Sequence, residues 1–387
     1  MFSIFKKKRC YFDYASTTPL DPRVLKAMSP FLGASYGNPS SPHKEGVEAR
    51  KAVEAARKQV ASIIQCKPDE IIFTAGGTES NNLAILGTFF HCKNVLKKDK
   101  IHFVTTSIEH SSVLEVFEQV RSLGAKVTYV SPEEDGLVSA KKIQDAIRGE
   151  TVMVSVMYAN SEIGTIQPIR EINRMLKEEK TKSDILFHVD ACQAASYLPL
   201  LIHDLGADLL TLDSSKMYGP KGTGILVSKA DISPIMFGGG QENNLRPGTE
   251  NVAGIVGFAS AFALAQKERV TESRRLRILR DRLKAELQKK VKGIKINGDL
   301  EKRLPNNLNI CIPGLDAEYA VLRLDALGFA ISSVTSCKSL SGDPSSYVIE
   351  ELYGDESCSR SSLRITLGRW TTDGEVRRLA AALLTVL

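Results

Sequence analysis

Two adjacent glycines lie between a short apolar run and a helical run, in the segment 74–82. Gly77 and Thr78 therefore place backbone N–H groups and a hydroxyl at the amino end of a helix. Unpaired N–H groups at that end attract anions, so the segment is compatible with phosphate binding. A plain tight turn is equally compatible with these residues, and the segment is neither a dinucleotide fingerprint nor a Walker loop.

Two more residues that could do chemistry come directly after apolar runs. Asp190 closes one such run, and Lys216 follows another in a turn of small residues. A carboxylate at a strand end could keep a pyridinium nitrogen protonated, as a pyridoxal phosphate electron sink requires. A lysine in such a turn can form a Schiff base with a carbonyl cofactor. The simpler alternatives are a helix cap for Asp190 and a solvated surface side chain for Lys216.

The order of phosphate turn, strand-end aspartate and lysine resembles the aminotransferase class V group of fold-type I pyridoxal phosphate enzymes. The resemblance narrows to one family, the cysteine desulfurases. Segments that resemble motifs of that family follow one another along nearly the whole chain, at 11–19, 37–43, 78–82, 109–110, 218–222, 246–251 and 361–369. The resemblance implies a fold-type I α/β fold, pyridoxal 5′-phosphate as cofactor and L-cysteine as substrate.

The resemblance also implies that three residues carry out the chemistry. Lys216 forms the Schiff base and then removes a proton from the substrate. His110 stacks on the cofactor ring and shuttles a proton. Cys337 attacks the substrate sulfur, so that alanine is released and a persulfide remains on the enzyme. Lys338, next to it, favours the thiolate only modestly, because an exposed lysine is screened by water.

Further residues are implied as ligands of the cofactor and the substrate. The cofactor set is Gly77, Thr78, His110, Asp190, Gln193, Asp213, Ser215, Lys216 and Thr249. In it, Asp190 pairs with the pyridine nitrogen, Gln193 bonds the ring hydroxyl, and Thr249 reaches the phosphate of the neighbouring subunit's cofactor. The substrate set is Asn160, Ser161 and Arg364, the last as a bidentate clamp for the carboxylate.

Three of these residues depart from the family pattern. Ser161 stands where a second Asn is usual, and Ser215 stands where a phosphate-binding His is usual. Asp213 stands where a hydroxyl side chain usually supports the phosphate. A carboxylate there should repel a phosphate dianion unless it points away or pairs with a cation. Outside the ring pocket, the segment 241–246 also lacks the Arg-Gly pair that usually follows Glu.

Apolar runs alternate with helix-like segments between residues 70 and 229, which predicts a mainly parallel sheet with helices on both faces. The expected strands are 71–73, 101–105, 126–130, 151–157, 185–189, 208–212 and 224–227. Ligands of such sheets bind at the carboxyl ends of the strands. Shorter strands at 307–312, 330–333 and 363–367 predict a smaller α+β domain. We therefore expect a large cofactor-binding domain, 15–262, and a small domain formed by 1–14 with 263–387, which carries the cysteine loop.

The composition is that of an ordinary globular protein, with 43% hydrophobic and 25% charged residues in a chain of 387. The longest uncharged stretch, 251–266, is too short to span a membrane, and the basic amino terminus lacks the apolar core of a signal peptide. We therefore expect a cytoplasmic protein. The seven cysteines have no metal-type spacing, so a disulfide scaffold or a metal site is not expected. All except Cys337 are interpreted as packing or incidental surface thiols.

The segment 267–292 combines a helical apolar pattern with eleven Lys or Arg and four Asp or Glu. A solvated helix face is the simpler interpretation, and an acidic partner or an RNA surface is the alternative. No direct nucleic-acid binding is predicted. The resemblance implies a homodimer that passes sulfur to an acceptor protein, either an iron–sulfur scaffold or a sulfur carrier. The expected pathways are iron–sulfur cluster assembly and the thiolation of cofactors or tRNA.

Two other functions are compatible with the sequence. A selenocysteine lyase, or another β-eliminating lyase of the same fold, would release its product without needing Cys337. A non-catalytic dimeric paralogue, acting as a partner or regulator, would bind the cofactor poorly, as Asp213 suggests. The joint presence of the five functional residues Lys216, Asp190, His110, Cys337 and Arg364 argues against the second alternative.

Overall fold

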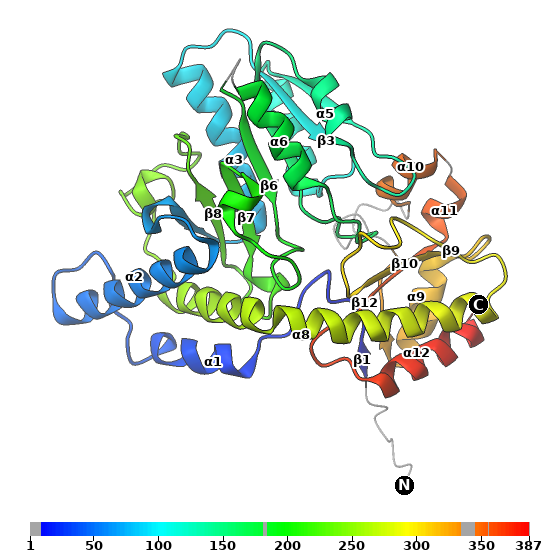
Figure 1. Ribbon diagram of the computed structural model, residues 1–387. Helices are drawn as coiled ribbons and strands as arrows, with labels where there is room; N and C mark the ends of the chain where they lie inside the picture. The colour runs from blue at the N-terminus through cyan, green and yellow to red at the C-terminus, as the bar shows by residue number, and fades with distance from the viewer. Residues whose placement is uncertain (1–8, 181–183, 334–344, 355, 387) are drawn as a thin grey trace.

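The computed structural model describes residues 9–180, 184–333, 345–354 and 356–386 (Figure 1). Its largest sheet has seven strands in the order β2-β8-β7-β6-β5-β3-β4. They are β2 (Ile71–Thr74), β3 (His102–Thr106), β4 (Lys126–Val130), β5 (Thr151–Met157), β6 (Leu186–Asp190), β7 (Leu209–Asp213) and β8 (Gly224–Ser228). The pairings among β3, β4, β5, β6 and β7 are parallel, and β8 runs antiparallel to both neighbours. The predicted, mainly parallel sheet is confirmed.

Helices cover both faces of this sheet, which explains why all of its strands except β4 are buried over most of their length. One face packs against α2 (Lys44–Ile64), α5 (Ala140–Ala146), α6 (Ile169–Lys180), α7 (Ile202–Leu205) and the first half of α8 (Val252–Lys290). The opposite face packs against α3 (Gly77–Phe90) and α4 (Ser111–Ser122). A further helix, α1 (Pro22–Met28), lies along α8.

The helix α8 joins two hydrophobic cores, and Figure 1 shows it running along one side of the molecule. Its first half contributes apolar side chains to the core of the large sheet, and its second half contributes Leu276, Leu279, Leu283 and Leu287 to a second core. The two helical patterns of the sequence thus form one continuous helix of 39 residues. The domain limits 15–262 and 263–387 stay a prediction.

The second core forms around a three-stranded antiparallel sheet of order β12-β10-β9. The strands are β9 (Lys295–Ile296), β10 (Asn307–Cys311) and β12 (Ser362–Thr366), and the helices in this part are α9 (Ala317–Ala326), α10 (Tyr347–Tyr353), α11 (Glu356–Arg360) and α12 (Asp373–Val386). The amino-terminal strand β1 (Cys10–Tyr11) joins here, because it pairs in parallel with β11 (Phe329–Ala330). The residues that follow β1, Ala15 and Ser16, then contact Lys216 at the carboxyl edge of the large sheet.

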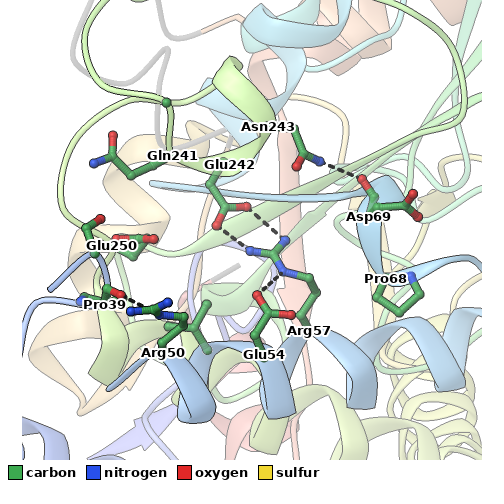
Figure 2. Close-up of a pocket in the computed structure, with 13 residues that line it drawn as sticks. Pro39, Arg50, Glu54, Arg57, Pro68, Asp69, Gln241, Glu242, Asn243 and Glu250 are labelled. Atoms are coloured by element: carbon green, nitrogen blue, oxygen red, sulfur yellow. Dashed lines mark hydrogen bonds and ion pairs between the residues drawn. The ribbon is translucent and has the colours of Figure 1, made fainter. Parts of the chain in front are cut away.

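A buried ion pair anchors the loop between β8 and α8 to α2 (Figure 2). Arg57 donates to both carboxylate oxygens of Glu242, at 3.0 and 2.5 Å, and Glu242 also accepts the amide of Phe73. Glu242, Asn243 and Asn244 all have φ between 45° and 64°, a left-handed conformation that is costly for side-chain-bearing residues. The ion pair lines a cavity of about 650 Å³ and fixes a strained segment a few residues before Thr249.

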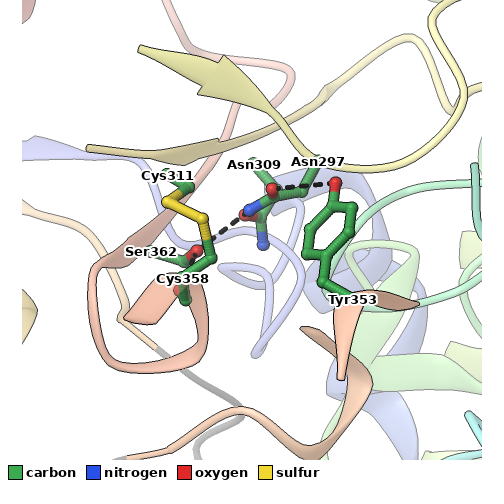
Figure 3. The surroundings of a disulfide bond; sticks show 6 residues. All are labelled: Asn297, Asn309, Cys311, Tyr353, Cys358 and Ser362. Carbon is green, nitrogen blue, oxygen red and sulfur yellow. Dashed lines mark hydrogen bonds between the residues drawn. A yellow bond between two sulfur atoms is a disulfide. The ribbon is translucent and has the colours of Figure 1, made fainter. Parts of the chain in front are cut away.

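A disulfide between the small sheet and α11 corrects one expectation (Figure 3). Cys311, at the end of β10, bonds to Cys358 of α11, with their Cα atoms 5.5 Å apart and both side chains buried. Beside it, Asn297 donates to Asn309 and to the hydroxyl of Ser362. The interpretation of these two cysteines as unpaired thiols is wrong. They lie 47 positions apart and meet only when α11 packs against the small sheet, so local spacing could not indicate the bond.

Candidate functional site

A cavity of about 200 Å³ opens at the carboxyl ends of β5, β6 and β7. Its walls combine residues from these strand ends with the amino ends of α3 and α4. They are Gly77, Thr78, Asn81, His110, Ser112, Met157, Ala159, Ser161, Asp190, Cys192, Gln193, Asp213 and Lys216. Parallel strands end at one edge of a sheet, which is why residues far apart in the sequence meet here.

Asp190 ends β6 and is buried, with 8% of its surface exposed. One carboxylate oxygen accepts the amide of Cys192 at 3.0 Å, and the other accepts the side-chain amide of Asn81 at 2.8 Å. Asn81 lies in the second turn of α3 and also donates to the hydroxyl of Ser112, at 2.9 Å. The carboxylate is thus fixed by uncharged donors, which leaves it able to face a cationic ring nitrogen.

His110 connects to the same network from the amino end of α4, where its side chain acts as the helix cap. Its Nδ1 accepts the backbone amide of Ser112 at 3.1 Å and lies 2.9 Å from the Ser112 hydroxyl. A neutral imidazole that accepts at Nδ1 carries its proton on Nε2. Ser112 and Asn81 therefore link His110 to Asp190 by hydrogen bonds across the cavity.

The carboxyl of Glu109, next to His110, is fully buried. It accepts the amide of Met157 at 2.9 Å and the hydroxyl of Thr106 at 2.8 Å. Burial, opposed by these two hydrogen bonds and reinforced by the charge of Asp190, raises the pKa of Glu109 to about 8. Glu109 is therefore mostly uncharged at neutral pH, and the negative charge in this part of the site is that of Asp190.

Lys216 reaches the cavity from the short 3₁₀ turn that follows β7. Its ammonium donates to the backbone carbonyls of Ser16 and Ala15, at 2.5 and 3.2 Å. Gln193 donates to the same Ala15 carbonyl at 3.0 Å. The amino-terminal segment thus holds both side chains at the cavity through its backbone oxygens, which are uncharged acceptors.

The glycine turn opens α3 as predicted, and only glycine fits there. Gly76 has φ of +147°, and a Cβ on Gly77 would lie 2.8 Å from the sulfur of Cys192. The amide of Gly77 donates to a carboxylate oxygen of Asp213, at 3.0 Å. The other oxygen of Asp213 accepts the amide of Ser215, at 2.7 Å. Asp213 therefore faces the turn and does not point away from it.

Arg364, on β12, contacts the cavity wall through Ser161, and 2% of its surface is exposed. One terminal nitrogen donates to Asp13 at 2.9 Å and to the Ser16 hydroxyl at 2.7 Å, and the other donates to the carbonyl of Ser161 at 3.3 Å. The buried guanidinium is thus oriented from three sides. A fixed fork of this kind suits a carboxylate.

Besides Arg364, three of the predicted residues that the structure describes are not part of the cavity wall. Asn160 uses its side chain inside its own loop, where it accepts the amides of Glu162 and Ile163 and donates to a backbone carbonyl. Its position supports the loop that presents Ser161. Ser215 contributes its amide to Asp213, and Thr249 is exposed and lines a different cavity. Cys337 lies outside the described residues.

Sequence reasoning gave no role to three residues that the fold brings into the site. Asn81 holds Asp190, Asp13 holds Arg364, and Cys192 lines the cavity with its thiol. Burial, followed by the charges of Asp190 and Asp213, raises the pKa of Cys192 well above its usual value, so the thiol is neutral. Asn81 and Asp13 stand in segments that carry the family resemblance, which was the available signal.

Comparison with known proteins agrees with this geometry. Residues 10–379 match the aminotransferase class-V family. The chain belongs to that family. It is 43% identical to "Cysteine desulfurase IscS" of Dictyoglomus turgidum, over 95% of this chain and 91% of the relative. Two solved structures are similar: a "NifS-like protein" (TM-score 0.90, 33% identity, 98% of this chain and 99% of the other) and "SspA in complex with cysteine" (TM-score 0.80, 32% identity, 94% and 99%).

Enzymes of this family depend on pyridoxal 5′-phosphate, and the cavity provides the donors and acceptors that this cofactor needs. Asp190 can face the pyridine nitrogen, and Lys216 provides an amine for the aldehyde. Gly77 and Thr78 provide backbone and hydroxyl donors at the amino end of α3 for the phosphate. The residues therefore fit the cofactor, with Asp213 as an acidic group at the phosphate end.

Proposed function

We propose that the chain is a cysteine desulfurase that converts L-cysteine to L-alanine and holds the sulfur as a persulfide on Cys337. The observation that carries the proposal is the meeting of Lys216, Asp190 and His110 at one cavity, in a chain 43% identical to a cysteine desulfurase. When bound, pyridoxal phosphate supplies an electron sink for the carbon next to the amino group.

The residues of the chain then have separate tasks. Lys216 accepts the proton from the substrate carbon, and its backbone-carbonyl contacts keep the amine at the cavity. Asp190 stabilises positive charge on the ring nitrogen. His110 exchanges a proton through Nε2, because Nδ1 is engaged by Ser112. Arg364 binds the substrate carboxylate beside the carbonyl of Ser161.

Sulfur transfer is assigned to the thiolate of Cys337. The thiolate attacks the substrate sulfur, the carbon–sulfur bond breaks, and its electron pair stays with the carbon fragment, which is protonated and leaves as alanine. The persulfide sulfur then passes to an acceptor protein, an iron–sulfur scaffold or a sulfur carrier. Five of the described cysteines are less suited to this task. Cys311 and Cys358 are bonded to each other, and burial raises the pKa of the Cys66, Cys92 and Cys192 thiols.

The proposal includes a cytoplasmic homodimer. The segments 36–40 and 237–243 both include residues that line the large cavity of Figure 2. Each carries an exposed aromatic side chain, Tyr36 at 79% and Phe237 at 84% exposure. Thr249 follows the second of these segments and is itself exposed. A second copy that covers this surface would receive Thr249 at its phosphate site.

None of the described helices is long and apolar enough to cross a membrane.

The test of the activity measures alanine and protein-bound persulfide after addition of L-cysteine to the wild type and to Cys337→Ser. We expect alanine from the wild type, a mass increase of one sulfur atom on Cys337, and loss of both in the variant. Alanine release that survives Cys337→Ser would identify a β-eliminating lyase. No visible Schiff-base band with excess cofactor would identify a non-catalytic paralogue.

The test of the dimer uses a mixed dimer of Lys216→Ala and Thr249→Ala chains. If Thr249 acts across the interface, one of the two sites has every residue intact, and the mixed dimer recovers about half of the wild-type activity. The two homodimeric variants are the controls and should both be impaired. Recovery of no activity would contradict the assignment of Thr249 to the neighbouring subunit.

A further inference from the structure

The carboxylate of Asp213 occupies a hydrogen-bonding position that a phosphate would use. Asp213 ends β7, and one of its oxygens accepts the amide of Gly77, the first residue of α3, at 3.0 Å. A Cβ built on Gly76 would lie 3.3 Å from the same oxygen, so the carboxylate packs directly on the glycine turn. The residue before the helix, Gly76, has no side chain to cap it, and Glu79 of α3 accepts only the amide of Ala75, ahead of the first helical residue. Asp213 therefore acts as the helix cap from a different element.

An amino end of a helix provides N–H donors and a partial positive charge, and it favours whichever anion lies closest. In most phosphate turns of this kind the anion is the ligand. Here an internal carboxylate already satisfies one donor, and a second amide, that of Ser215, holds its other oxygen at 2.7 Å. A bound phosphate must share the turn with a negative charge or displace it.

Within the part of the chain that the structure describes, no lysine, arginine or histidine forms an ion pair with Asp213. The ammonium of Lys216 is turned to the carbonyls of Ala15 and Ser16. Arg246, from the loop before α8, pairs with Glu79 at 3.0 Å. The negative charge beside the glycine turn is thus held by amides alone, and it opposes a second anion.

We propose that Asp213 is a specificity-determining residue of the cofactor site, which reduces the preference of the site for the phosphorylated cofactor over unphosphorylated pyridoxal. The proposal rests on the proposed function, because it concerns the same cofactor. The ring end of the cavity, with Asp190 and Asn81, is equally favourable to both forms of the cofactor. The discrimination must therefore come from the turn at Gly77, where Asp213 competes with the phosphate.

The test is an equilibrium titration of the full-length apo protein, freed of cofactor with hydroxylamine, with pyridoxal 5′-phosphate and separately with pyridoxal. It compares the wild type with Asp213→Ser and Asp213→Asn. Serine keeps an oxygen acceptor and removes the charge, and asparagine keeps the size of the side chain as well. We expect both variants to bind pyridoxal 5′-phosphate at least about tenfold more tightly, which corresponds to about 1.4 kcal/mol, and pyridoxal within about twofold of the wild type.

The matched control is Asp208→Asn, just before the other end of β7, where the carboxylate accepts the amide of Phe187 at 2.8 Å. This variant removes the same charge far from the turn and should leave the ratio of the two affinities unchanged. Inorganic phosphate adds a second readout, since it should compete with pyridoxal 5′-phosphate more strongly in Asp213→Ser than in the wild type. Circular dichroism of each apo protein confirms folding.

The outcomes separate the inference from the proposed function. If wild type and variants bind pyridoxal 5′-phosphate with the same preference over pyridoxal, or if the variants lose preference, the inference is overturned and the proposed function stands. If the wild type turns over L-cysteine and the variants gain preference as expected, both are supported. If no protein in the series binds either compound, the proposed function fails and the inference fails with it.

Discussion

Asp190 and Asp213 end neighbouring parallel strands, β6 and β7, and their carboxylates are held in nearly the same way. In each, one oxygen accepts the amide two residues further along the chain, at 3.0 Å for Asp190 and 2.7 Å for Asp213. In each, the second oxygen accepts a donor from α3: the side chain of Asn81 for the first and the amide of Gly77 for the second.

The two aspartates differ in what lies opposite them when the cofactor binds. Asp190 faces the ring end, where positive charge on the nitrogen is needed, so its charge assists the chemistry. Asp213 faces the phosphate end, where its charge opposes the ligand. An aspartate in this turn geometry can therefore stabilise or oppose the part of the cofactor that faces it. The charge of that part of the cofactor decides which.

The largest effect should come from Lys216, which lines the same cavity as the two aspartates. Lys216→Ala removes both the amine for the aldehyde and the group that accepts the substrate proton. We expect alanine formation to fall by about 10³-fold, within the range for a lost proton-transfer group, and the visible Schiff-base band to disappear. Absorption spectra and alanine assays measure the two effects.

A matched control for this substitution is Lys221→Ala, since Lys221 also donates to a backbone carbonyl, that of Thr18, at 2.7 Å, but does not line the cavity. It should keep the band. Retention of the band by Lys216→Ala would mean that another amine holds the cofactor and would remove the basis for the comparison of the two aspartates.

The next effect is on stability and concerns Glu242, a carboxylate that forms an ion pair with Arg57. Glu242 is almost fully buried against Arg57, so Arg57→Met leaves an unpaired buried charge in a segment of three left-handed residues. We expect the free energy of unfolding to fall by about 3 to 5 kcal/mol, measured by urea denaturation. The double variant with Glu242→Leu should lose less, because no charge is left unpaired. Equal losses in the two variants would contradict the ion-pair explanation.

A smaller effect, on rate, separates the two aspartates directly. Asp190→Asn keeps an oxygen acceptor for Cys192 or Asn81 but removes the charge that the ring nitrogen needs. We expect alanine formation to fall by about a hundredfold, as for the loss of one electrostatic contact in a buried site. Cofactor affinity should change much less, which an absorbance titration can measure. An Asp190→Asn enzyme that loses affinity and keeps its rate would reverse the roles assigned to the two residues.

Local sequence pattern predicted the large sheet well because its signal is local. Most of its strands are buried, largely apolar segments between helices. The rule that ligands bind at the carboxyl ends of parallel strands then brought Asp190 and Lys216 together. The position of Asp213 followed from the same rule. Its conflict with the phosphate was expected from the family resemblance and from its charge, on the condition that it neither points away nor pairs with a cation.

Contacts between distant segments could not be predicted in this way. The amide that holds Asp213 belongs to Gly77, 136 positions earlier, and the partner of Arg57 lies 185 positions later. Cys311 and Cys358 are joined only by the packing of α11 on the small sheet. Such pairs depend on which elements become neighbours, and a single sequence carries no local periodicity for that.

The smallest predicted effect concerns Glu109, a fully buried carboxyl that forms no ion pair with any residue the structure describes. Burial raises its pKa to about 8, so between its unfolded value and pH 8 the folded protein binds a proton that the unfolded chain has lost. Stability from this group therefore decreases as the pH rises toward 8, by at most about 1.4 kcal/mol per pH unit. His188 and His102, whose pKa values are lowered to about 4, are neutral in both states above about pH 7 and do not obscure the effect.

Glu109→Gln tests this, because glutamine imitates the protonated carboxyl and can still accept the amide of Met157. Urea denaturation of the wild type should give a lower free energy of unfolding at pH 8 than at pH 7, and the variant should lose less over the same interval. Equal slopes would mean that Glu109 is ionised in the folded protein. The wall beside Asp190 would then carry two negative charges, and the charge of Asp190 alone could not account for the favourable ring end.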